Sequence, residues 1–191
     1  MQQTSSYKVI LVGDSKVGKS SFFIRAIKNI TPQQPKSTIG VEYASKQIVY
    51  KEQLITLKIW DTAGSEKYKS VTSNHFRQSQ GALLFYDLTD LYTYENIQNW
   101  LKDIHGYADE SVAIVIVGNK LDLVNDAQNL RCIPQEKVQQ MCKDQNLLYA
   151  EISTKTGEGI NELIELLVKN LQINKIQNVQ QQERPRQNCC Y

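Results

Sequence analysis

The sequence predicts a single α/β domain built on a six-stranded, mostly parallel sheet with helices on both faces. Apolar runs rich in β-branched residues alternate along the chain with stretches of helical periodicity. Two of these runs, at residues 82–88 and 112–118, are almost continuously apolar, which is typical of parallel strands covered on both faces. The chain has 191 residues, so it has room for one such domain and little else.

The expected elements follow one another from the first residues of the chain. A strand at residues 7–12 precedes a helix at 20–28, and two successive strands at 41–50 and 54–60 predict one antiparallel pair. From there on strands and helices alternate, as they do where a parallel sheet is extended. These later elements are expected at residues 82–88, 94–107, 112–118, 134–144, 147–152 and 159–172.

The chain changes character after residue 172. From Ile173 onward the helical periodicity fails, and glutamine and asparagine dominate the sequence. Such a stretch cannot bury enough apolar surface to offset the entropy of ordering it. We therefore expect a folded domain over residues 1–172 and a flexible tail over residues 173–191.

Composition and charge argue against several classes of protein. Hydrophobic residues make up 41% of the chain and charged residues 22%, which is an ordinary cytosolic balance. A net charge of +2 is too small for a nucleic-acid binder, which would carry a marked basic stripe. Residues 1–6 are polar and unlike a signal peptide, and no apolar run approaches the roughly 18 residues of a membrane helix. The cysteines indicate no disulfide framework, and Cys132 and Cys142 are interpreted as structural.

A phosphate-binding motif lies between the first strand and the first helix. Residues 13–20, GDSKVGKS, match the pattern G-x-x-x-x-G-K-[ST]. The glycines allow backbone N–H groups to converge on an anion, and the helix N-terminus adds the positive end of its dipole. We expect Lys19 to reach the β- and γ-phosphates and the Ser20 hydroxyl to bind Mg²⁺. The residues expected to contact the nucleotide here are Ser15, Lys16, Val17, Gly18, Lys19, Ser20 and Ser21.

A second motif indicates which base is bound. Residues 119–122, NKLD, follow a buried strand, so their side chains emerge at the carboxyl edge of the sheet, where α/β proteins bind ligands. The Asp122 carboxylate can accept hydrogen bonds from the N1–H and 2-amino groups of guanine, whereas adenine offers no such pair. A backbone N–H just past the last strand would meet the guanine O6. The expected base-side residues are Asn119, Lys120, Asp122, Ser153, Thr154 and Lys155.

Two further segments supply candidate ligands for Mg²⁺ and the γ-phosphate. Asp61, at a strand end, can hold the metal through water, and the Gly64 N–H can approach the γ-phosphate because glycine has no Cβ. Thr38, in the loop before the second strand, offers a hydroxyl in the triphosphate state. The predicted metal ligands are Ser20, Thr38 and Asp61.

These elements, in this order, resemble those of the Ras superfamily over about residues 7–172, and within it the chain resembles the Rab family. The resemblance implies a single P-loop GTPase domain that binds GTP or GDP with Mg²⁺. It also implies a slow GTPase that works as a switch in vesicle traffic. The segments that carry the Rab resemblance are IGVEY at 39–43, LKIWDTAG at 57–64, LFYDLT at 84–89, NWLKDI at 99–104 and the terminal Cys-Cys-x.

The resemblance also implies that the protein is a monomer and that it binds partner proteins. Switch regions at residues 30–43 and 62–77 would be ordered by the γ-phosphate and released after hydrolysis. Tyr43, Trp60 and His75 would form the aromatic surface that effectors read, although His75 replaces the usual tyrosine. Effectors, exchange factors and activating proteins would therefore bind through the switches.

The terminal cysteines imply a membrane anchor. Cys189 and Cys190 resemble the ending that Rab proteins present for double geranylgeranylation, and they do not fit C-a-a-X. Two lipid chains give stable anchoring where one gives only reversible binding. The resemblance therefore implies a protein on the cytoplasmic face of an intracellular membrane that cycles with the cytosol.

Three residues depart from the family pattern. Ser65 stands where the family places a glutamine that orients the attacking water, so intrinsic hydrolysis is expected to be slow. Thr31 stands where an aromatic ring usually lies against the guanine. Lys16 occupies a loop position that is small in many relatives, and its side chain is expected to point into solvent. The expected catalytic residues are Lys19, Thr38, Gly64 and Ser65.

Two other functions compete with a slow regulatory GTPase. Ser65 would also suit a scaffold that stays loaded with GTP and recruits effectors without hydrolysis. A P-loop kinase for small molecules would need an arginine-rich lid, and the sequence contains no such cluster.

Overall fold

The computed structural model describes residues 4–28, 30, 41–62, 76–109, 111–127 and 130–182. Most of the nucleotide, metal and phosphate-loop predictions fall within these ranges. The predictions at Thr31, Thr38, Gly64, Ser65, His75, Cys189 and Cys190 lie outside the described residues.

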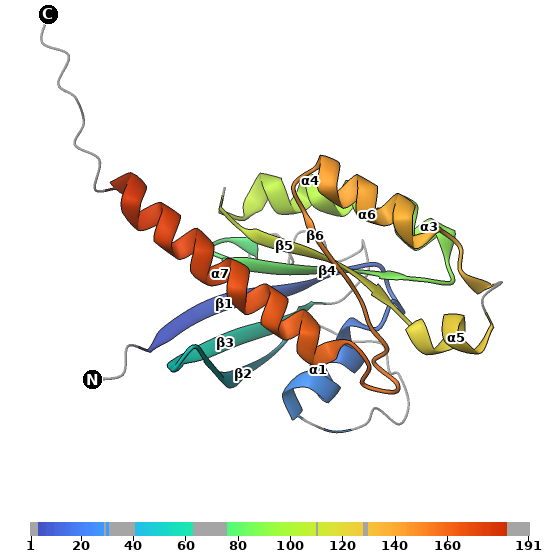
Figure 1. Ribbon diagram of the computed structural model, residues 1–191, viewed down its shortest axis with the longest axis horizontal. Coiled ribbons are helices and arrows are strands. Elements are labelled where there is room, and N and C mark those ends of the chain that lie inside the picture. The colour runs from blue at the N-terminus through green and yellow to red at the C-terminus, as the bar shows by residue number, and fades with distance from the viewer. Residues whose placement is uncertain are drawn as a thin grey trace, which may run out of the picture.

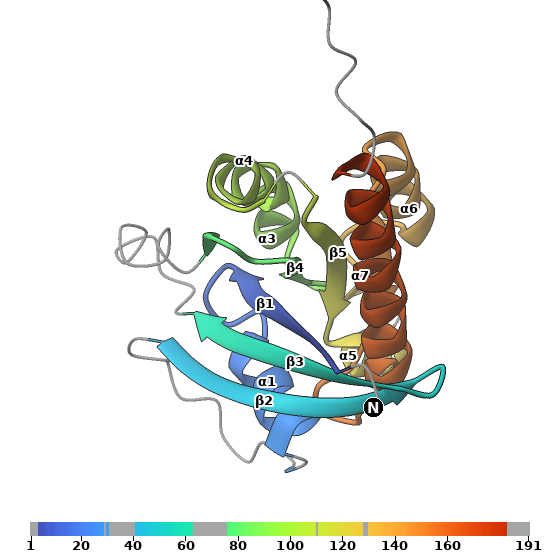
Figure 2. The same ribbon diagram turned by 90° about the vertical axis from the view of Figure 1, so that its left-hand side faces the viewer.

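One six-stranded sheet runs through the domain, as predicted. The strands lie in the order β2-β3-β1-β4-β5-β6, and Figure 2 shows β2, β3 and β1 side by side. The pairing of β2 with β3 is antiparallel and the other four pairings are parallel. The strands are β1 Ser5–Gly13, β2 Val41–Tyr50, β3 Gln53–Thr62, β4 Gly81–Asp87, β5 Ala113–Asn119 and β6 Leu148–Glu151.

Helices cover both faces of the sheet. In Figure 1, α4 and α6 lie above the strands, α1 lies below them and α7 crosses in front. Alternate residues of β1 point to opposite faces: Val9 and Leu11 pack with α1 and α7, whereas Ile10 and Val12 pack with α4 and α6. The helices are α1 Lys19–Lys28, α3 Leu91–Glu95, α4 Ile97–Tyr107, α5 Leu121–Asp126, α6 Gln135–Asp144 and α7 Ile160–Gln182.

The helices differ from the predicted ones in three places. The helix expected at 94–107 starts earlier and is divided at Asn96 into α3 and α4, and α5 was not expected. The last helix continues to Gln182 instead of ending near residue 172. Contacts with distant parts of the chain support this extension, because Asn174 Nδ2 donates to the Ser111 carbonyl at 2.7 Å and Lys175 Nζ donates to Ser5 Oγ at 3.0 Å. Such long-range partners leave no periodic signal in the sequence.

None of the helices in the described ranges combines the length and the apolar character needed to cross a bilayer.

The strand register brings the predicted site together at one edge. Asp61 of β3 lies opposite Leu11, two residues before the end of β1. Asp87 and Asn119, the last residues of β4 and β5, lie opposite each other. Because these strands are parallel, their carboxyl ends meet at the same side of the sheet, where loops of an α/β protein bind ligands.

Candidate functional site

The phosphate loop depends on two glycines that lie against other parts of the chain. Gly13 has φ 131° and Gly18 has φ 100°. A Cβ on Gly13 would lie 2.3 Å from the carbonyl oxygen of Phe85, and one on Gly18 would lie 2.0 Å from Nδ2 of Asn119. Neither position accepts a side chain without movement of the backbone or of Asn119. The glycines therefore allow the loop to seat directly on β4 and β5.

Lys19 is held inside the loop that precedes it. Its Nζ donates to the carbonyl oxygens of Gly13 at 2.9 Å and Asp14 at 2.7 Å, and the residue is buried. Burial lowers the pKa of the Lys19 ammonium to about 8, and the nearby carboxylates of Asp61 and Asp14 act in the opposite direction. A desolvated cation is thus already placed among the loop carbonyls, where an anionic phosphate gains most from it.

Two of the predicted Mg²⁺ ligands lie in the described residues, and they come from neighbouring elements. Ser20 lies in the first turn of α1, next to Lys19, and Asp61 is fully buried in β3. The Asp61 carboxylate interacts electrostatically with Lys19, which places it beside the phosphate loop. Hydroxyl and carboxylate oxygens are the donors that Mg²⁺ prefers, so this donor set fits the metal.

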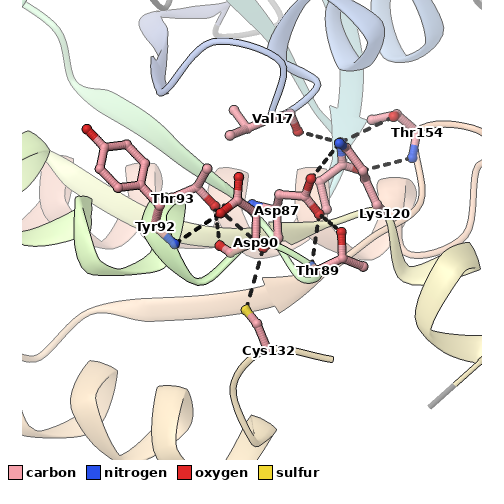
Figure 3. Close-up of polar contacts among 10 residues, drawn as sticks. Val17, Asp87, Thr89, Asp90, Tyr92, Thr93, Lys120, Cys132 and Thr154 are labelled. Atoms are coloured by element: carbon pink, nitrogen blue, oxygen red, sulfur yellow. Dashed lines mark hydrogen bonds and ion pairs between the residues drawn. The ribbon is translucent and has the colours of Figure 1, made fainter. Parts of the chain in front are cut away.

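Asn119 joins the phosphate loop to the loop after β6. Its Nδ2 donates to the Val17 carbonyl at 2.7 Å and to Thr154 Oγ1 at 3.3 Å. Its Oδ1 accepts a hydrogen bond from the Thr154 N–H at 3.1 Å. Figure 3 shows Val17 and Thr154, two of the partners of this amide, lying near each other. The two halves of the predicted site, for phosphates and for base, are therefore connected through one buried amide.

The predicted base-side carboxylate is buried and oriented. Asp122 lies in the first turn of α5, and its Oδ1 accepts from Ser153 Oγ at 2.6 Å. Ser153 is itself fixed, because its Oγ accepts from the Thr156 N–H at 3.0 Å. The exposed Lys155 ammonium lies 3.5 Å from Asp122 Oδ2. The structure thus brings together residues from two predicted segments that lie about 30 positions apart.

Asp87 is a site residue that the motif analysis did not single out. Its Oδ2 lies 2.5 Å from Nζ of Lys120, and its Oδ1 accepts from the N–H and Oγ1 of Thr89 at 2.9 and 2.7 Å (Figure 3). Lys120 has φ 70°, a left-handed conformation in which the Asp87 pair holds its side chain. Its position could have indicated it, because Asp87 ends a buried strand and lies next to Asn119 at the carboxyl edge of the sheet.

Arg25 is a second residue that the motifs did not reveal. From α1 it donates to the carbonyl oxygens of Lys155 at 2.9 Å and Thr156 at 2.6 Å. A Cβ on Gly157 would lie 2.7 Å from the guanidinium, so glycine makes room for it. These partners lie about 130 positions away in the sequence, which leaves no local pattern to detect.

Comparison with known proteins decides the family. A model of the Ras family matches residues 8–173, which covers the whole of this site. The chain belongs to the Ras family of small GTPases. The phosphate loop, Asp61 and the segments around Asn119 and Ser153 therefore all lie within the matched Ras-family region.

Curated relatives place this GTPase on the Rab and Ypt branch. It is 38% identical to Ras-related protein RabC of Dictyostelium discoideum over 90% of this chain and 87% of the relative. It is 38% identical to Ras-related protein RABA1e of Arabidopsis thaliana, over 82% and 70% of the two chains. It is 37% identical to GTP-binding protein ypt3 of Schizosaccharomyces pombe, over 86% and 75%. The Rab resemblance of the sequence is thus confirmed.

Lys16 generates a prediction about stability. The residue is exposed, as expected, but it has φ 66°, where a side chain costs about 1–2 kcal/mol relative to glycine. We expect Lys16→Gly to be more stable than Lys16→Ala by about 1 kcal/mol, since only glycine relieves the strain and neither variant keeps the lysine. Thermal unfolding of the two variants measures the difference. Equal stability would show that the loop carries no strain at this position.

Proposed function

We propose that this Rab-type protein is a molecular switch that binds GTP or GDP with Mg²⁺ and hydrolyses GTP slowly. The observation that supports it most is the connection of the phosphate loop to the base-side residues through Asn119 at one edge of the sheet. A single ligand that carries both phosphates and a base matches this layout. Vesicle traffic on an intracellular membrane is the process that the Rab relationship suggests.

The residues of the phosphate side have separate tasks in this proposal. The N–H groups of the loop and the Lys19 ammonium bind the phosphates, and Ser20, Thr38 and Asp61 hold Mg²⁺. When bound, the metal supplies charge neutralisation at the β- and γ-phosphates. Gly64 would give its N–H to the γ-phosphate, and Ser65 takes the sequence position where the family places the glutamine that orients the attacking water.

The residues of the base side select guanine. Asp122 accepts hydrogen bonds from the N1–H and 2-amino groups, while Ser153 keeps the carboxylate in place at 2.6 Å. Adenine would leave this buried carboxylate without those donors, which is a larger penalty than the loss of a hydrogen bond in water. Lys120 of the same motif is held by the ion pair of its Nζ with Asp87.

The nucleotide content of the purified protein tests this proposal. Acid extraction followed by chromatography is expected to release about one guanine nucleotide per chain and no adenine nucleotide. Competition by GDP and ADP against a fluorescent GDP then measures the preference. Tight binding of ADP would favour the small-molecule kinase and contradict the switch.

An aromatic surface on β2 and β3 is proposed as the effector-binding site. The rings of Tyr43 and Trp60, which face each other across the two strands, lie 5.0 Å apart. Tyr43 is exposed, and Nζ of Lys8 lies 5.5 Å from the Trp60 ring centroid. Aromatic rings such as the exposed Tyr43 and the half-buried Trp60 supply large contact area, and tyrosine and tryptophan are enriched among the residues that dominate partner binding.

The first of three predictions from this proposal concerns the base. Asp122→Asn is expected to weaken GDP binding by about 10²-fold or more, because two hydrogen bonds to a charged acceptor are lost. Xanthosine diphosphate, which presents an acceptor where guanine has a donor, is expected to bind the variant better than GDP. Titration of both nucleotides measures this. Asn125→Ala, an exposed change on the same helix, is the control, and an unaltered preference in Asp122→Asn would refute the assignment.

The second prediction concerns hydrolysis. Ser65→Gln is expected to raise the intrinsic rate by about tenfold, equivalent to about 1.4 kcal/mol of barrier, because glutamine can orient the attacking water. Single-turnover hydrolysis measures the rate, and Ser65→Ala is the matched control. If the wild type does not hydrolyse GTP even with cell extract, the scaffold is the better description. If glutamine gives no gain, water positioning does not limit the rate.

The third prediction concerns the membrane. We propose that Cys189 and Cys190 carry two isoprenoid chains, so that Cys189→Ser/Cys190→Ser becomes cytosolic while each single variant is partly displaced. Fractionation of cells and intact-mass analysis of membrane-extracted protein measure both points. Cys132→Ser, in the folded domain, is the control and should stay on membranes. Membrane-bound protein with both terminal cysteines unmodified would contradict the anchor.

A further inference from the structure

We propose that Asp14, Asn96 and Trp100 form a bracket that holds the phosphate loop in its nucleotide-binding conformation and slows nucleotide release. This inference rests on the proposed binding of guanine nucleotide. Asp14 is the second residue of the phosphate loop, and its side chain contacts residues at the start of α4. Its Oδ1 accepts from Asn96 Nδ2 at 2.6 Å and from the indole Nε1 of Trp100 at 2.9 Å.

The same residue also contacts the lysine of the motif. The backbone carbonyl of Asp14 accepts from Nζ of Lys19 at 2.7 Å. Asp14 therefore connects α4 through its side chain to Lys19 through its backbone. A rotation of the Asp14 peptide that moved the Lys19 contact would also strain the two side-chain hydrogen bonds.

The two donors are held rigidly. Asn96 lies at the junction of α3 and α4, where its N–H donates to the carbonyls of Tyr92 and Tyr94. Its Oδ1 accepts from Asn99 Nδ2 at 2.7 Å, which orients the amide toward Asp14. Trp100 is 6% exposed and belongs to the apolar cluster that α4 forms with the sheet. The bracket thus fastens a loop to an element that is packed on the core.

The charge on Asp14 matters for this role. In the described part of the chain its Oδ2 is buried and accepts no hydrogen bond, so half of the carboxylate is desolvated without direct compensation. Hydrogen bonds to a carboxylate are about twice as strong as neutral ones, which explains why a charged acceptor serves at this position.

The release of a fluorescent GDP at fixed Mg²⁺ concentration tests the bracket. Trp100→Phe keeps a buried ring but removes the N–H together with part of the indole, so we expect release to be roughly fivefold to tenfold faster. Asp14→Ala removes both hydrogen bonds and is expected to release faster still, whereas Asp14→Asn keeps a carbonyl acceptor and should lie between it and the wild type. Adding Trp100→Phe to Asp14→Ala should give no further increase, because the partner is already gone.

A change on the buried side of the same helix controls for loss of stability. Ile104→Val loosens the packing of α4 without touching Asp14, so it should lower the melting temperature and leave GDP release unchanged. Release as slow as wild type in both Trp100→Phe and Asp14→Ala would overturn the bracket while nucleotide binding stands. Equal acceleration by Ile104→Val would overturn it as well, since general loosening would then suffice. A wild type that retains no GDP would refute the proposed function and the bracket with it.

If Trp100→Phe does not fold, Asp14→Ala still tests the bracket, because Asp14 lies in a loop and not in the core. The two tryptophans of the chain give two indole N–H signals in a ¹⁵N-edited spectrum. The Trp100 signal is expected to exchange slowly with solvent in the wild type and much faster in Asp14→Ala. No change in that exchange would contradict the hydrogen bond itself.

Discussion

The Asn119 amide is the contact on which the site depends. It donates to the Val17 carbonyl and accepts from the Thr154 N–H, and so it joins the loop after β1 to the loop after β6. The requirement for glycine at position 18 follows from it, because a Cβ there would lie 2.0 Å from Nδ2. A buried amide with its donors and acceptor used in this way fixes distances that flexible loops could not maintain alone.

The buried charged groups lie at the same edge of the sheet, whereas the rest of the sheet interior is mostly apolar. The four central strands are apolar along most of their length, and the buried charged and amide groups Lys19, Asp61, Asp87, Asn119 and Asp122 occur in or next to their carboxyl ends. Such groups are costly to bury unless each meets a partner or a ligand. Three of these groups have partners in the protein. Asp87 pairs with Lys120, Asp122 accepts a hydrogen bond from Ser153, and Lys19 donates to the loop carbonyls. A bound nucleotide would supply its phosphates and base as further partners for these buried groups.

The sequence predicted the sheet, the phosphate loop and the base-side residues because each has a local signature. Residues 13–20 form one contiguous motif, and the strands are apolar runs of characteristic length. The contacts of Arg25 and of Asp14 were not predictable, since their partners lie more than 80 positions away. The extension of α7 to Gln182 was missed for the same reason, as its support comes from Ser5 and Ser111. The roles of Thr38, Gly64 and Ser65 remain predictions, because these residues lie outside the described ranges.

Amide hydrogen exchange of Asn119→Ala in the nucleotide-bound protein tests the central claim most directly. If Asn119 connects the two halves of the site, exchange should become faster both at residues 13–18 and at residues 154–156, although these segments are far apart in sequence. Asn125→Ala, which removes an exposed amide that contacts Glu158 at 3.3 Å, should leave both segments protected. Faster exchange confined to the immediate neighbours of residue 119 would contradict the account, because the phosphate and base halves would then be held independently.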